Sequence, residues 1–273
     1  MSFLKNQIGS LFLIMLVSLA TTTNIFPQDY PIKIKILTFL QTQNSSYKAS
    51  DAKGYGLGAQ MNFSIMKNLD YCLKVYYDQA RLEQMDVLDE WDWDYWEKTY
   101  IDFLPGTDAT IVNKTLEYTS TDSIYSAVFH PRQSLKELRL FTGFEYNVPV
   151  TQKLGLLLGL DGGVSLFNRE LEMHEDWTKR YKLNPESPEK FDYEFKYKLL
   201  HFAPTKKGKM LFASPSIGAK YNLSSSLDLT MGVNYTHYFH REKLLGVRLS
   251  EIGRRWFPIK SKTQVLVGLT FKY

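Results

Sequence analysis

Alternation of apolar and polar residues is the feature that most constrains how this chain can fold. It is clearest in the segment 263–273, which reads T-Q-V-L-V-G-L-T-F-K-Y. On an extended strand, one face would carry Val265, Val267, Leu269, Phe271 and Tyr273, and the other Gln264, Gly268, Thr270 and Lys272, with Leu266 as the exception. Alternation of this length predicts a β-strand. An apolar face opposite a small or polar one suits a strand that lies between lipid and an enclosed interior.

The same pattern recurs along the chain and predicts eight strands. We place them at 32–41, 54–66, 71–78, 136–148, 154–166, 213–223, 227–236 and 263–273. Their connections alternate between long and short, with the longest loops at 79–135 and 168–209. A soluble sandwich has no reason to keep this alternation, whereas a membrane barrel has short turns on one side and long loops on the other.

The predicted fold is therefore an all-β, closed, antiparallel, up-and-down transmembrane barrel with eight strands. Closure is required because lipid cannot satisfy an open sheet edge. Alternation in Phe191, Tyr193, Phe195 and Tyr197 suggests that strands extend well above the membrane. A barrel with ten strands is the alternative, in which Thr110–Tyr118 and Ser123–Phe129 form an extra hairpin. Pro215 removes a ladder hydrogen bond from the sixth strand, so we expect a bulge there or a position above the membrane core.

The N-terminus has the features of a secretory signal peptide, predicted at 1–20 with cleavage between 20 and 28. Lys5 gives it a positive start, 11–17 is apolar, and small residues follow at Ser18 and Ala20. The apolar run is shorter than the ~20 residues that span a bilayer, which disfavours an N-terminal anchor. The mature chain, 21–273, is then one barrel domain. Its single cysteine, Cys72, excludes an intrachain disulfide.

Aromatic residues fall at both ends of the predicted apolar faces. Those near the short turns are Phe63, Tyr71, Tyr146, Tyr221 and Phe271, and those near the long loops are Tyr55, Tyr77, Tyr235 and Phe239. Two aromatic girdles around an apolar band are typical of barrels that span a membrane. With these girdles, the turn pattern and the terminal aromatic strand, the chain resembles the small eight-stranded outer-membrane barrels, the group of the OmpA transmembrane domain, OmpX and OmpW.

This resemblance implies the bacterial outer membrane as the compartment, with its lipids and the barrel assembly machinery as partners, the latter through the C-terminal strand. It also implies a monomer. The resemblance rests on pattern and not on residue motifs, so it specifies architecture better than activity. The formal net charge is only +4, and no basic tract is present, so we expect no nucleic-acid partner.

Charged residues on the inner faces predict a lumen filled by side chains. An eight-stranded barrel is just wide enough for side chains to fill it, and buried charges must pair. The predicted network comprises Lys33, Lys35, Lys74, Arg139, Glu145, Asp161 and Lys220. We expect Lys74 and Glu145 to lie within direct or water-bridged reach of each other or of Arg139, and Lys220 near Asp161 or Asp228. Rim positions in water are expected for Asp78, Glu137 and Asp228, and an inward, packed thiol for Cys72.

The stretch 90–97, E-W-D-W-D-Y-W-E, is the most unusual local sequence. Its candidate binding residues for a sugar, a host protein or an envelope protein are Trp91, Asp92, Trp93, Asp94 and Trp96, although aromatics that pack on one another are the simpler interpretation. The acidic pair resembles one in the omptin proteases, whose carboxylates and histidine activate water. No Asp-x-His arrangement accompanies it here, and Thr236–His240 lacks the serine of lipid A deacylases.

We therefore expect no catalytic residues, no metal site and no cofactor. The favoured function is a structural or binding role of the surface loops on a barrel with a filled lumen. The alternatives are a narrow channel for small or apolar solutes and, less favoured, a protease or lipid-modifying barrel enzyme.

Overall fold

The computed structural model describes residues 32–46, 51–84, 87–101, 112, 115–181, 191, 193–239, 243–244, 247–248 and 256–272. The expected signal peptide and the terminal Tyr273 lie outside these residues. The long strands are β1 (Ile32–Ser46), β2 (Asp51–Met66), β3 (Leu69–Glu83), β5 (Tyr125–Pro149), β6 (Leu154–Tyr181), β7 (Tyr193–Phe202), β8 (Lys206–Asn222), β9 (Leu227–Tyr238) and β12 (Ile259–Lys272). The short elements are α2 (Val87–Trp91), α3 (Asp94–Trp96), the π-helical turn η1 (Glu97–Ile101), β4 (Glu117–Thr119), β10 (Lys243–Leu244) and β11 (Val247–Arg248).

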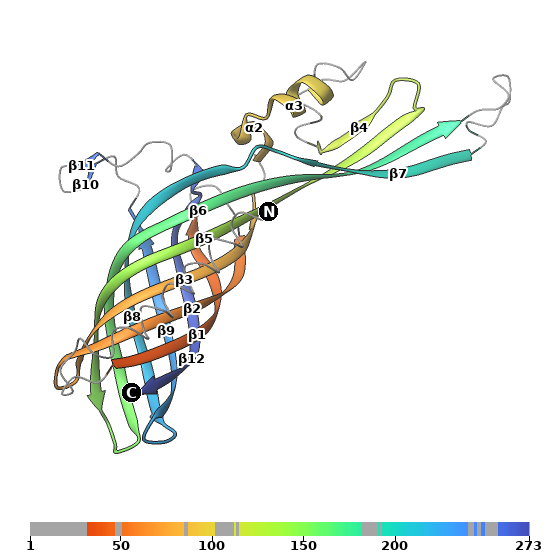
Figure 1. Ribbon diagram of the computed structural model, residues 1–273. Coiled ribbons are helices and arrows are strands. Elements are labelled where there is room, and N and C mark those ends of the chain that lie inside the picture. The colour runs from red at the N-terminus through yellow and green to blue at the C-terminus, as the bar shows by residue number, and fades with distance from the viewer. Residues whose placement is uncertain are drawn as a thin grey trace, which may run out of the picture.

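Eight antiparallel strands close into a barrel, in the order β1, β2, β3, β5, β6, β8, β9, β12 and back to β1 (Figure 1). The prediction of a closed eight-stranded barrel is confirmed. The ten-stranded alternative is wrong, because β4 and β7 pair only with the upper parts of β5 and β6 and do not enter the ring. Within the described ranges, no helix is long and apolar enough to cross a membrane.

Side chains alternate across the barrel wall as the sequence predicts. Leu40, Leu57 and Leu160 point outward with 71%, 66% and 63% of their surface exposed, whereas Lys35 and Gln60 point inward and are buried. Two-residue alternation therefore separates an apolar outer surface from a polar lumen, and the register shifts in β1 and β2 lie near the strand ends, at 43–46 and 64–66. Short turns join β2 to β3, β5 to β6 and β8 to β9 at one end of the barrel, and Asn68 takes the left-handed conformation in the first of them.

Pro215 lies in the barrel wall opposite Leu160, and the expected bulge is absent. The register between β8 and β9 is the same on both sides of it, from Ala213 with His237 to Ser216 with Asn234. The preceding Ser214 instead compensates through its side chain, whose Oγ lies 2.9 Å from Thr236 Oγ1 and donates to the Tyr235 carbonyl at 3.4 Å. A neighbouring hydroxyl thus bridges the strands where proline leaves no amide donor.

The regions expected as loops at 79–135 and 168–209 contain long strand extensions. β5 and β6 have 25 and 28 residues and continue well beyond the barrel mouth, where they lean to one side (Figure 1). There β4 pairs with β5, and β7 pairs with β6. We call this protruding sheet the wing, and it comprises β4, β7 and residues 125–132 and 170–181. The eight predicted strands do not include the wing, because its aromatic and charged residues do not show the apolar face of a lipid-exposed strand. The alternation at 191–197 does predict strands above the membrane, and β7 is one of them.

Candidate functional site

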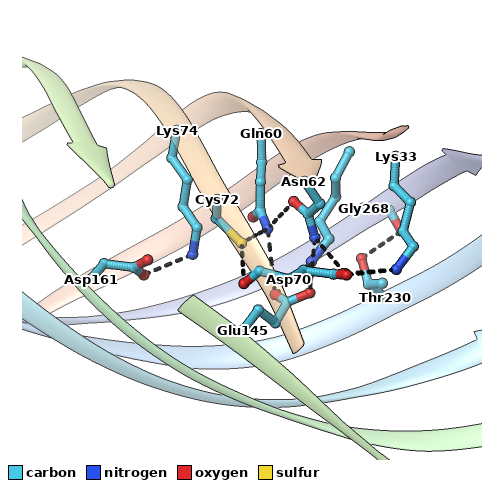
Figure 2. A network of polar contacts seen from close by, with 11 residues as sticks. Lys33, Gln60, Asn62, Asp70, Cys72, Lys74, Glu145, Asp161, Thr230 and Gly268 are labelled. Carbon is cyan, nitrogen blue, oxygen red and sulfur yellow. Dashed lines mark hydrogen bonds and ion pairs between the residues drawn. The ribbon is translucent and has the colours of Figure 1, made fainter. Parts of the chain in front are cut away.

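The lower half of the lumen is filled by three ion pairs with their amide neighbours (Figure 2). The nitrogen–oxygen distances are 2.7 Å for Lys33 with Asp70, 2.9 Å for Lys35 with Glu145 and 2.7 Å for Lys74 with Asp161. Gln60 donates to Asn62 at 2.6 Å, and Asn62 donates to Glu145 at 3.3 Å. Such partners matter because a buried charge is tolerated only when its remaining hydrogen-bonding capacity is satisfied.

The upper half holds a second network around two carboxylates, Asp78 and Glu137. Arg139 lies 2.9 Å from Asp78, while Lys262 lies 3.1 Å from Asp78 and 2.7 Å from Glu137. Tyr238 donates its hydroxyl to Glu137 at 2.7 Å. Asp78 and Glu137 are only 0% and 1% exposed, so the expected rim positions in water are wrong for both. Asp228, also expected at the rim, is 1% exposed and pairs with Lys272 at 2.6 Å.

The lumen charges meet different partners from those inferred from the sequence. Lys74 and Glu145 each pair with another residue, because Asp161 and Lys35 reach across the lumen to them. Lys220 is half-buried on the inner face of β8, and its ammonium interacts electrostatically with the carboxylate of Asp228. Lys262 and Asp70 were missed, since they had been assigned to a loop and a turn. Extending the alternation from Gln264 back by one inward position identifies Lys262.

Aromatic rings fill the space around the Arg139 guanidinium. Its carbon lies 5.4–6.0 Å from the ring centres of Phe39, Tyr76, Phe141 and Phe212. These contacts are within the range at which a cation is attracted to a ring face. A cavity of about 40 Å³ beside Lys35, Lys74 and Glu145 leaves room for only a few water molecules. Ion pairs and aromatic rings thus occupy the interior at the levels of Lys74 and Arg139. Cys72 is fully buried in it, within 3.4 Å of the Gln60 amide.

Arg169 connects the barrel mouth to the helices above it. Its side chain is fully buried and donates to Gln133 at 2.6 Å and to the carbonyl of Trp256 at 3.4 Å. Its guanidinium also lies 5.0 Å from the Trp91 ring and 3.6 Å from Glu90. One cation thus holds α2 against the mouth. Arg169 was missed from the sequence because it lies in a region assigned to a loop.

The predicted binding tryptophans form the core of a second apolar cluster outside the barrel. Trp91, Trp93 and Trp96 are 0%, 5% and 1% exposed, and they pack with Phe129, Leu171, Met173 and Trp177 of the wing. Their burial corrects the expectation that they form a binding loop and agrees with aromatics that pack on one another. Asp92 and Asp94 are exposed, but they lie in and after a turn between short helices and not on one strand face.

An exposed stripe of aromatic residues lies farther out on the same face of the wing. Tyr181 stacks on Tyr193 with ring centres 5.2 Å apart, and Phe195 stacks on Tyr197 at 5.8 Å. Lys179 lies 5.2 Å and 5.0 Å from the rings of Tyr125 and Tyr181, whose hydroxyl groups raise its pKa. Tyr193 and Phe195 are 52% and 56% exposed. We call this group, Tyr125, Lys179, Tyr181, Tyr193, Phe195 and Tyr197, the aromatic stripe.

The opposite face of the wing carries ion pairs. Asp176 lies 3.0 Å from Lys198 and 3.6 Å from His130, and the hydrogen bond from Lys198 holds its pKa below the usual value. Among the described residues, no group of three or more His, Cys, Asp or Glu side chains could hold a metal ion.

No protein-family model matches the sequence, and a comparison with curated proteins finds no match. Among solved structures, the Neisserial surface protein NspA is 10% identical, with a TM-score of 0.41, 89% of this chain and 97% of that chain covered. Outer membrane protein OprG from Pseudomonas aeruginosa is 12% identical, with a TM-score of 0.40 and coverage of 89% and 96%. A major outer membrane protein from Thermus thermophilus is 9% identical, with a TM-score of 0.39 and coverage of 88% and 99%.

These solved structures are small bacterial outer-membrane β-barrels, the class that the sequence resembles. They share the expected compartment, the bacterial outer membrane.

Proposed function

We propose that the chain is an outer-membrane barrel with a closed lumen that carries the wing as a binding element on the cell surface. The membrane location is supported by the outer surface, where apolar residues such as Ile36, Leu40 and Leu269 are exposed over the whole barrel wall. Aromatic residues border this band at both ends, including Tyr146 near the short turns and Tyr55 near the mouth. A soluble protein would bury so much contiguous apolar surface.

The aromatic stripe is the single observation that carries the binding role. Tyrosine and phenylalanine rings offer large contact area with few rotatable bonds, which is why aromatics are enriched at recognition surfaces. Here stacking with neighbouring rings already fixes Tyr193 and Phe195, yet each is more than half exposed. The buried tryptophans pack on the part of the wing nearer the barrel. The aromatic stripe therefore lies on a folded sheet. Its chemistry suits a glycan or a partner protein, whose apolar patches would cover the rings.

Binding assays with whole cells test this proposal. The paired change Tyr193→Ser and Phe195→Ser should lower attachment to immobilised matrix proteins or glycans at least about tenfold, as expected for loss of interface hot spots. The matched control is Tyr95→Ser, which removes another exposed aromatic of the same region but lies outside the stripe. Equal binding by wild type and the paired variant, with both at the cell surface, would reject the stripe as the binding site.

Transport through the lumen is the weaker alternative, because ion pairs and rings occupy the barrel interior. We also infer that the chain is not a hydrolase. His174 and His201 lie beside Glu172 and Glu175 on the wing, at 3.3 Å and 3.5 Å, and not opposite an acidic pair on a strand. Incubating the purified barrel with peptides and with lipid A should yield no cleavage, and product formation would replace the binding proposal with an enzymatic one.

A further inference from the structure

The two faces of the wing continue the two sides of the barrel wall. β6 pairs with β8 from Leu154 to Arg169 and then with β7 from Glu172 to Tyr181, and no register shift interrupts either ladder. The side that faces the lumen below therefore carries Leu171, Met173 and Trp177 above, where the helices cover it. The side of β6 that faces away from the lumen in the barrel continues as the other face of the wing, which the helices do not cover. We call it the outer face, and it continues the lipid-exposed surface of the barrel.

The wing leans away from the barrel axis in the direction that turns this outer face toward the membrane. In Figure 1, β5, β6 and β7 sweep sideways from the mouth, and α2 and α3 lie on the upper side of the sheet. Since the helices contact only the face with the buried tryptophans, the outer face is the lower one.

Exposed apolar residues on the outer face are flanked by lysines. Leu200 and Phe202 are 46% and 65% exposed. Along the chain they lie between Lys196 on one side and Lys207 and Lys209 on the other, all three exposed and on the same face. An apolar centre between basic side chains is the composition of surfaces that lie in a membrane interface.

On this face Glu170, Asp176 and Glu194 lie beside lysine or arginine, and Glu172 lies beside His174. Their nitrogen–oxygen distances are 2.6 Å for Glu170 with Lys136, 3.3 Å for Glu172 with His174, 3.0 Å for Asp176 with Lys198 and 3.1 Å for Glu194 with Arg180. Among the described residues no carboxylate pairs with Lys196, Lys207 or Lys209 within 4.0 Å, so no ion pair there compensates the charges of these three lysines.

We propose that the outer face of the wing rests on the membrane that holds the barrel. Phe202 and Leu200 enter the boundary between headgroups and acyl chains, and Lys196, Lys207 and Lys209 bind the phosphates of anionic headgroups. The occupant follows from the charge of the face and from its continuity with the lipid-exposed wall. The inference rests on the proposed membrane location but not on the aromatic stripe, which lies on the other face.

Site-specific fluorescence tests this contact. In a Cys72→Ser background, Phe202→Cys or Phe195→Cys is labelled with an environment-sensitive dye. The barrel is then refolded into phosphatidylcholine vesicles with or without phosphatidylglycerol, and headgroup-nitroxide lipid serves as quencher. Position 195 is the matched control, because it lies on the same strand, is 56% exposed and points to the other face. We expect quenching at 202 only, strengthened by phosphatidylglycerol.

Charge reversal gives the second arm. Lys196→Glu, Lys207→Glu and Lys209→Glu should each weaken attachment at 202 by at least about fivefold, because each removes the contribution of one basic residue near an anionic surface and adds a negative charge. Mobility shifts on heating report barrel insertion separately, so failure of the membrane proposal is distinguishable from failure of this contact. Equal quenching at 195 and 202, or no response to phosphatidylglycerol, would overturn the proposal. If the dye at 202 becomes more protected from the nitroxide as the protein-to-lipid ratio rises, the outer face contacts a second copy of the chain and not the membrane.

Discussion

Lys262 is shared by two buried carboxylates in the upper lumen. Its Nζ lies 2.7 Å from Glu137 and 3.1 Å from Asp78, and its side chain is fully buried. Arg139 supplies Asp78 with a second cation, whereas the other described groups that bond to Glu137 are the hydroxyl groups of Ser165 and Tyr238. Removing the ammonium would leave a carboxylate without a compensating charge, which is much more costly than losing an exposed pair.

Lys262→Met should therefore lower the free energy of unfolding by about 3–5 kcal/mol. Urea unfolding of the refolded barrel, followed by tryptophan fluorescence, measures it. Lys198→Met is the control, because that side chain is 83% exposed on the wing and its pair with Asp176 is screened by water. A loss as small as that of the control would mean that water reaches Glu137.

Double substitutions distinguish the observed lumen pairs from the ones inferred from the sequence. Lys74→Met alone should destabilise by about 3–5 kcal/mol, since it leaves Asp161 unpaired. Adding Asp161→Leu should restore much of that loss, because two apolar groups leave no charge uncompensated. Adding Glu145→Leu instead should increase the loss, since it breaks the pair with Lys35. Rescue by Glu145→Leu and not by Asp161→Leu would contradict the structure.

Inward orientation could be predicted for single residues, but partner choice could not. Alternation placed Lys74 and Glu145 inside correctly, because orientation depends only on position along a strand. Which carboxylate a lysine meets depends on strand tilt and on reach across the lumen, and neither is visible in a strand's own sequence. Lys262 was missed for a different reason, since β12 begins before its apolar outer face does.

At the scale of elements, the hairpin of β5 and β6 couples the barrel to the wing. Its lower part forms barrel wall, and its upper part supports the helical segment through Phe129, Leu171 and Met173. Trp96 packs edge-on against Phe129 with ring centres 5.0 Å apart and is 1% exposed. The helices are too short to be stable alone, so burial of their tryptophans against the hairpin holds them in place.

Trp96→Ala should remove about 3–5 kcal/mol of packing from this cluster and release the segment 87–101. Limited proteolysis should then cut that segment faster, while the barrel keeps its heat-modifiable migration. Tyr95→Ala is the neighbouring control, since its ring is 39% exposed. Equal protection of the Trp96 variant and the control would show that the segment is held by contacts other than this core.

The barrel strands were predictable from sequence as elements, and the wing was predictable only in part. A lipid-facing strand needs an apolar residue at every second position, and this pattern predicts β2 and β12 from the sequence. The alternating aromatics at Phe191, Tyr193, Phe195 and Tyr197 suggested strands above the membrane, as β7 shows. The upper part of β5 carries His130 and Arg132 on its outer face, so it lacked the apolar period and was assigned to a loop.

At the scale of the whole molecule, the chain has three parts: the barrel wall, the side chains that point into the lumen, and the one-sided wing. In the closed barrel that we propose, the inward side chains of the wall themselves form the plug. Arg139 and Arg169 are the two largest buried cations in it, one inside the lumen and one at its mouth. The central claim is that their ion pairs and aromatic contacts close the lumen.

Planar-bilayer conductance tests that claim most directly. The refolded wild-type barrel should insert, as judged by its heat-modifiable migration, and show no current steps above the bare bilayer. The double variant Arg139→Ala and Arg169→Ala, which removes both cations and their packing, should show discrete steps and thereby prove that opened barrels are detectable. Sustained ion-conducting steps from the wild-type protein would contradict the closed lumen and make transport the favoured function.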